Sequence, residues 1–137
     1  MRRDRAVACL AFCLLAAPVS AEAVLSLSVG ARTLDIPPSA IAEMDISESG
    51  GITDVFLRLM PGASDALAHL TEEAIGRTMT LSVCGAPLIA PVVRERIGSG
   101  TVYIAGTTMI RAEAMRALWH GRARCDTLAP EVFENGQ

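Results

Sequence analysis

Short runs of alternating apolar and polar residues open the chain and predict β-strands. Residues 24–29 place apolar side chains around two serines, which is typical of a half-buried strand. Gly30 and Ala31 can turn the chain, and residues 33–36 can return as a second strand. Two prolines follow and end this unit, because proline cannot donate to a strand ladder. Residues 22–38 are therefore predicted to form an N-terminal β-hairpin.

The middle of the chain predicts a strand followed by a helix. Residues 54–59 alternate between one face that is more apolar and one that is less so. Pro61 suits the first turn of a helix, and Gly76 stands where a C-terminal cap belongs. Between them apolar residues recur at helical spacing: Ala63, Ala66, Leu67, Leu70, Ala74 and Ile75. Residues 39–49 give a weaker strand pattern.

The second half of the chain predicts three more strands and a second helix. Residues 78–84 alternate, a short strand follows at 88–90, and residues 101–105 form another. Thr107 or Thr108 can cap the last helix. Its apolar stripe consists of Ile110, Ala114, Ala117 and Leu118. This order predicts an α+β fold, with a small antiparallel sheet and two helices packed on one face.

The domain organisation is predicted to be simple. Residues 22–126 are expected to form a single domain, consisting of the hairpin at 22–38 and a core at 39–126. The tail at 127–137 is polar and contains Pro130, so it is expected to be loose.

Residues 1–21 have the pattern of a secretory signal peptide. Three arginines near the start precede an uncharged apolar run at 6–17, which is too short to span a bilayer. Small residues before Ala21 suit cleavage there, and a second site follows Ala23. The alternative is an uncleaved N-terminal anchor. Cleavage would place the chain in the periplasm or outside the cell, with no membrane insertion.

The charge of the chain excludes some partners. Removing residues 1–21, with their three arginines and one aspartate, lowers the formal charge from −3 to −5. An acidic surface argues against nucleic acid and against anionic membranes. The chain contains no lysine, so it has no Schiff-base lysine and no phosphate-loop lysine.

Two cysteines, Cys84 and Cys125, remain after cleavage. An even pair in an oxidising compartment favours a disulfide. The alternatives are two buried free thiols or a metal site. Neither histidine neighbours a cysteine in sequence, so we expect no metal.

The residues that most often carry catalysis form no recognisable motif. His69 and His120 lie on the two predicted helices, and His69 has no second histidine four residues on. The chain also lacks a nucleophile elbow and a glycine-rich dinucleotide motif. We expect no catalytic residue and no cofactor. Arg94 and Arg96, separated by Glu95, form either an exposed segment of alternating charge or a contact surface for a partner.

The residues from about 40 to 118 resemble a known family, and the positions that match it in order and spacing begin at residue 71. The matching positions are Thr71, Ile75, Gly76, Leu81, Gly85, Ala90, Pro91, Ile97, Gly100, Ile104, Gly106, Glu113, Ala114 and Leu118. The pattern resembles the head of the first periplasmic domain of SecD, in the SecD/SecF protein-export family. All these positions have scaffold duties, so the resemblance implies a fold and a compartment and no catalytic residue.

The chain also departs from that family. SecD has several membrane helices, a larger periplasmic base and a SecF partner, none of which this sequence contains. The cysteine pair lies outside the family pattern. The resemblance therefore implies a stand-alone exported relative of the head.

Three functions are consistent with these patterns. The first is a non-catalytic periplasmic binding or accessory module that contacts polypeptides or an envelope protein in an export-related role. The second is a small periplasmic hydrolase with an unrecognised site. The third is a structural subunit of an envelope complex that uses an exposed sheet edge. The sequence leaves the ligand and the oligomeric state open.

Overall fold

The computed structural model of this chain describes residues 23–129 and 131–134. The predicted signal peptide and both predicted cleavage positions precede or border this part, so residues 1–21 lie outside the described residues. Within the described ranges, no helix is long and apolar enough to cross a membrane.

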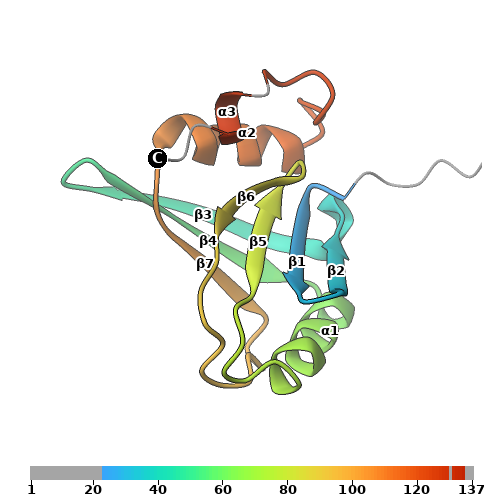
Figure 1. Cartoon of the computed structure of the whole chain (residues 1–137). Helices are drawn as coiled ribbons and strands as arrows, with labels where there is room; N and C mark the ends of the chain where they lie inside the picture. The colour runs from blue at the N-terminus through green and yellow to red at the C-terminus, as the bar shows by residue number, and fades with distance from the viewer. Residues whose placement is uncertain (1–22, 130, 135–137) are drawn as a thin grey trace, which may run out of the picture.

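Among the residues that the structure describes, seven strands form two antiparallel sheets. In Figure 1 the four-stranded sheet lies in front of the three-stranded sheet, so they are called the front sheet and the rear sheet. The four-stranded sheet has the order β2-β1-β5-β6, and the three-stranded sheet has the order β3-β4-β7. The strands are β1 (Leu25–Val29), β2 (Arg32–Ile36), β3 (Ile41–Ser49), β4 (Ile52–Leu59), β5 (Thr80–Val83), β6 (Ala86–Ile89) and β7 (Thr101–Thr107).

The α+β class and the N-terminal hairpin are confirmed. The structure adds a division that the sequence did not indicate, because the strands belong to two sheets instead of one. The hairpin β1–β2 joins the front sheet through β5, where Leu25 lies opposite Val83 and Ser28 opposite Thr80. The weakly patterned residues 39–49 contain β3, which pairs with β4 along most of its length.

Both main helices cover the buried face of the three-stranded sheet. Helix α1 (Pro61–Glu72) contacts β2 and β4, whereas α2 (Met109–Trp119) contacts β3 and β4. Figure 1 shows them at opposite ends of the molecule, α1 at the bottom and α2 at the top. The indole N–H of Trp119 donates to the backbone oxygen of Ile41 at 3.2 Å, which fixes α2 on β3.

A single cluster of buried apolar side chains joins the two sheets and the helices. Because side chains alternate along a strand, every second residue of β1 and β4 enters this cluster. The buried members from β1, β4, α1 and α2 are Leu25, Leu27, Val29, Val55, Leu57, Leu59, Leu67, Leu70, Met115 and Leu118. On the opposite face of β4, Ile52, Phe56 and Arg58 are exposed and Asp54 is half-buried, so this face is open to solvent.

The two helices begin as the sequence predicts, but α1 ends earlier than predicted. Helix α1 begins at Pro61 and ends at Glu72 with Glu73 as its C-cap, so the prediction that Gly76 caps this helix is wrong. Gly76 follows in the turn with a φ of 82°, and its N–H donates to Val93 O at 2.7 Å. Thr108 caps α2, because its side chain accepts from the backbone N–H of Arg111 at 3.3 Å.

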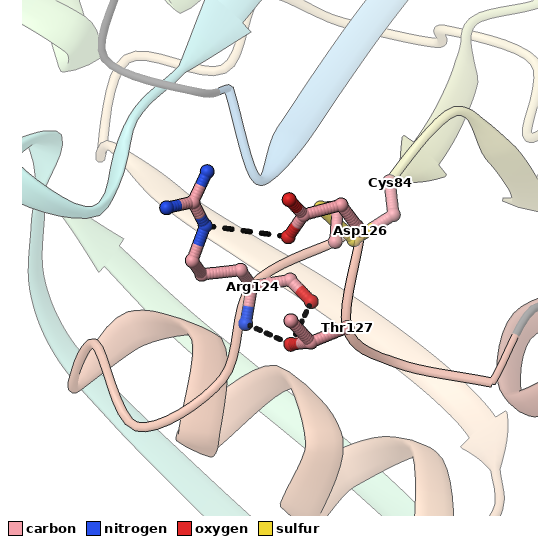
Figure 2. The surroundings of a disulfide bond; sticks show 5 residues. Cys84, Arg124, Asp126 and Thr127 are labelled. Carbon is pink, nitrogen blue, oxygen red and sulfur yellow. Dashed lines mark hydrogen bonds and ion pairs between the residues drawn. A yellow bond between two sulfur atoms is a disulfide. The ribbon is translucent and has the colours of Figure 1, made fainter.

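The C-terminal segment is tied to the front sheet by a disulfide between Cys84 and Cys125 (Figure 2). Their Cα atoms lie 5.3 Å apart, within the usual range for a disulfide. Part of the segment predicted as a loose tail is ordered against the domain. A short helix, α3 (Glu131–Glu134), buries Phe133 in the common core.

Replacing both Cys84 and Cys125 by serine should lower the free energy of unfolding. The bond closes a loop with a sequence separation of 41 residues. On the chain-entropy model a loop of this length stabilises the fold by about 4 kcal/mol. Urea denaturation of the wild type and of the double variant measures the difference. The reduced wild type is the matched control and should unfold at the same urea concentration as the variant. Equal stability of the oxidised and reduced wild type would contradict the bond.

Candidate functional site

A groove of about 230 Å³ lies between the open edges of the two sheets. Strand β6 ends the front sheet and β7 ends the rear sheet, and the segment at 91–97 forms part of the wall. The lining is mainly apolar and consists of Met79, Leu81, Ile89, Pro91, Ile97 and Val102, with Thr101 and Tyr103 at the β7 side. A groove of this kind suits apolar side chains of a ligand.

The segment that walls the groove is held by hydrogen bonds to α1 and to the turn after it. The hydroxyl oxygen of Thr71 accepts the backbone N–H of Ile97 at 2.9 Å, and this threonine is fully buried. Val93 exchanges backbone hydrogen bonds with Gly76 and Arg77, at 2.7 and 2.8 Å. The wall is therefore part of the folded scaffold.

The structure places Arg94 and Arg96 on this segment but outside the groove. Both side chains are exposed, and neither is among the residues that line the groove. Arg96 lies 3.8 Å from Glu72 of α1, a distant and exposed ion pair that contributes little stability. Within the described residues Arg94 makes no ion pair. Their role as partner contacts stays a prediction.

Two stacked aromatic rings lie beside the groove on the exposed face of the three-stranded sheet. The ring centroids of Phe56 and Tyr103 are 4.6 Å apart with an interplanar angle of 27°. The two residues are direct partners across β4 and β7. Their side chains stay 41% and 47% exposed, which is unusual for a stacked pair that serves only the core.

Two carboxylates, of Asp54 and Asp45, lie next to this aromatic pair. One oxygen of Asp54 accepts the Tyr103 hydroxyl at 2.9 Å, and the other accepts the Gly106 N–H at 2.9 Å. The hydrogen bond to Asp54 raises the pKa of Tyr103, and slight burial and the charge of Asp54 act in the same direction. Asp45 lies directly opposite Phe56 on β3, so its carboxylate shares the face.

The two histidines lie apart from both features. His69 is exposed on α1, and His120 is exposed at the end of α2, where it packs against Trp119 at a centroid distance of 4.5 Å. Neither imidazole has a hydrogen-bond partner among the described residues. In the same part of the chain, no three His, Cys, Asp or Glu side chains gather in a group that could hold a metal ion.

A larger hollow of about 590 Å³ lies beside the disulfide. It is bounded by the β5–β6 turn and the C-terminal segment, including Cys84, Cys125 and Phe133. Its charged side chains, Asp126 and Glu134, are both acidic. Its lining includes Ala129 and Glu134, which are next in sequence to residues outside the described part, so it carries no functional argument.

Sequence analysis missed the aromatic pair. The alternation in β4 places Phe56 on the more polar face, which was a usable signal, because a large apolar residue there is out of pattern. Its contact with Tyr103 depends on the register between β4 and β7, which the local pattern does not contain.

Replacing Asp54 by asparagine should lower the titration midpoint of Tyr103. The carboxylate favours the protonated phenol, so its contribution to stability is present below pH 10.0 and is lost as the pH rises through the raised pKa. Tyr103 is the only tyrosine, so the ultraviolet absorbance of tyrosinate reports it alone. The native midpoint should lie above 10.0 and return toward it in Asp54→Asn.

The matched control for this titration is Asp45→Asn, which removes a nearby carboxylate that makes no hydrogen bond to the phenol. It should leave the midpoint close to that of the native chain. Equal midpoints in the native chain and in Asp54→Asn would show that the hydrogen bond does not persist in solution.

Comparisons with known proteins support the fold. No family model and no curated protein matches the chain. A solved structure of a membrane component SecDF that enhances protein export matches with a TM-score of 0.52 and 22% identity, covering 64% of this chain and 39% of that one. A crystal structure of SecDF in a super-membrane-facing form matches with a TM-score of 0.51 and 23% identity, covering 64% of this chain and 12% of that one. The chain thus spans less than half of either, and the likeness establishes a SecD-like fold.

Proposed function

We propose that this chain is a non-catalytic accessory module of the periplasm that contacts extended polypeptides in an export-related role. In this proposal it is a stand-alone exported relative of the SecD head. The SecDF structures that share its fold belong to a component that enhances protein export, which supports this direction.

The observation that carries the proposal is the apolar groove between two sheet edges. An unfolded chain exposes apolar side chains that a folded protein hides, and a groove lined by Leu81, Ile97 and Val102 offers them a place out of water. Neighbouring Arg94 and Arg96 are exposed and add a charged rim on the same segment. We propose that they contact the same polypeptide, through weak and salt-sensitive interactions.

Export of the chain is part of the proposal and is tested separately. The signal peptide at 1–21 should be removed, so that N-terminal sequencing of the protein recovered from the periplasm begins at Glu22, or at Val24 if the second site is used. An intact Met1 on membrane-associated protein would overturn this part.

Polypeptide binding should depend on the groove. The probe is a fluorescent, reduced and carboxymethylated protein that cannot refold, titrated with the mature chain and followed by anisotropy. Ile89→Gln places an amide in the groove wall and should weaken binding about ten-fold, since burying an apolar side chain is worth about 1.5–3 kcal/mol.

The double variant Arg94→Ala/Arg96→Ala should bind the same probe more weakly than the native chain at low salt and equally well at high salt, because salt screens the contribution of exposed charges.

The matched control for the groove variant is Ile110→Gln, which changes an isoleucine that is 73% exposed on α2. It should bind the probe as the native chain does. Thermal unfolding of both variants shows whether either has lost its fold. Absence of binding by the native chain, or equal loss in the two isoleucine variants, would refute the proposed function.

A further inference from the structure

We infer that the polypeptide binds as an additional strand on the open edge of β7, with apolar side chains over the groove and arginine or lysine side chains on the opposite face. This inference rests on the proposed function and specifies the class of sequence that the groove accepts. Three features of the described residues carry it: the direction of the β7 backbone groups, the contrast with β6, and the charge around the aromatic pair.

The backbone of β7 has hydrogen-bonding groups that point away from its sheet. Leu59 N–H donates to Gly100 O at 2.9 Å, and the register continues with Leu57 opposite Val102. In an antiparallel pair, hydrogen-bonded positions alternate with positions whose groups point the other way. Gly100 and Val102 therefore face β4, whereas Tyr103 directs its N–H and C=O outward, over the groove.

Thr101 shows the same outward direction. Its backbone N–H donates to the hydroxyl of Ser99 at 3.3 Å instead of to β4. For Tyr103, the next outward position, the part of the chain that the structure describes supplies no such partner. An outward N–H and C=O on the edge strand of a sheet are a ready template for another strand, and here they lie beside an apolar groove.

The other edge along the groove is not suited to pairing. Strand β6 has four residues, and its second residue is Pro87, opposite Ser82. Proline has no N–H and is a common means of protecting an edge from further strands. Of the two edges that border the groove, β7 is therefore the one that can accept a strand.

An added strand would have two different faces. Successive side chains of a strand point to opposite sides, as Val102 and Tyr103 already do on β7. Side chains beside Val102 would cover the groove and contact Leu81 and Ile97. Side chains beside Tyr103 would lie on the exposed face, next to the aromatic pair.

The charge of the exposed face determines which side chains of the added strand can lie beside Tyr103. Glu43 and Arg58 neutralise each other in an ion pair at 2.6 Å. Asp54, which accepts the Tyr103 hydroxyl beside the β7 edge, and Asp45, next to Phe56 on β3, remain as negative charges on this face. A guanidinium or ammonium group over an aromatic face is attracted by the negative face of the ring, and nearby carboxylates add to this attraction. Basic residues therefore complement this face, and acidic residues do not.

The test uses synthetic peptides titrated into the mature chain, so that the fold of the protein is unchanged. One peptide alternates valine and arginine, a second has the same composition in two blocks, and a third alternates valine and glutamate. The alternating valine–arginine peptide should bind at least about ten-fold more tightly than either of the others, a difference of about 1.4 kcal/mol. If the block peptide binds as tightly as the alternating valine–arginine peptide, the polypeptide does not bind as an added strand. If the glutamate peptide binds as tightly, the exposed face has no preference for basic side chains.

N-methylation of the alternating valine–arginine peptide tests the backbone contact. In one version all arginine N–H groups are methylated, and in the other all valine N–H groups. Only one set of amides can face β7, so one version should lose binding and the other should retain it. Loss in the arginine version indicates an antiparallel strand, because the residue opposite Tyr103 shares its face and directs its N–H toward it. Equal effects of the two methylations would contradict strand addition.

Charge selection is tested on the protein with Asp54→Asn, which removes the carboxylate beside Tyr103, matched by Asp65→Asn on α1. The first variant should reduce the preference for arginine over glutamate, and the second should leave it unchanged. Unchanged preference in both would overturn the charge argument.

Two further outcomes separate this inference from the proposed function. If the carboxymethylated protein binds in a groove-dependent way but the peptides all bind equally, strand addition is refuted and the proposed function still holds. A dimer in sedimentation experiments that the alternating peptide fails to dissociate would show that the edge serves a second copy of this chain, which also overturns the inference.

Discussion

The two-residue periodicity of β4 is the constraint on which the other features depend. Its buried face packs against both helices and helps to form the core, and its exposed face carries Phe56. Because β4 is also the central strand of its sheet, it aligns β3 and β7 on either side. A shift of one residue in the pairing of β7 would separate Tyr103 from Phe56 and turn Val102 out of the groove.

Local patterns in the sequence predict most elements of this fold and little of their pairing. The alternation in β1 and β4 and the proline at the start of α1 reflect short-range chemistry, so these elements were predictable, whereas the end of α1 at Glu72, four residues before Gly76, was not. The pairing of Leu25 with Val83 joins residues far apart in the chain. No local pattern specifies such a contact, which is why one sheet was expected and two are present.

In the candidate site, too, single residues were predictable from the sequence and their arrangement in space was not. Gly76, Ile97 and Thr71 were assigned scaffold duties from the sequence, and the structure gives Thr71 a concrete one, because its buried hydroxyl holds Ile97 in the groove wall. The exposed charges of Arg94 and Arg96 were visible as a pattern, but the groove beside them was not. A groove between two edges exists only after both sheets have formed, so it has no signature within any single element.

The size of the groove also bears on how strongly such a site can bind. At about 230 Å³ it has room for only a few side chains. Burying each gains about 1.5–3 kcal/mol, whereas ordering each backbone residue of a flexible polypeptide costs about 1–2 kcal/mol. Hydrogen bonds along β7 would add about 0.5–1.5 kcal/mol each, so the terms nearly cancel. A small groove beside one open edge therefore favours contacts that form and break rapidly, in which many segments of a polypeptide can be accepted in turn.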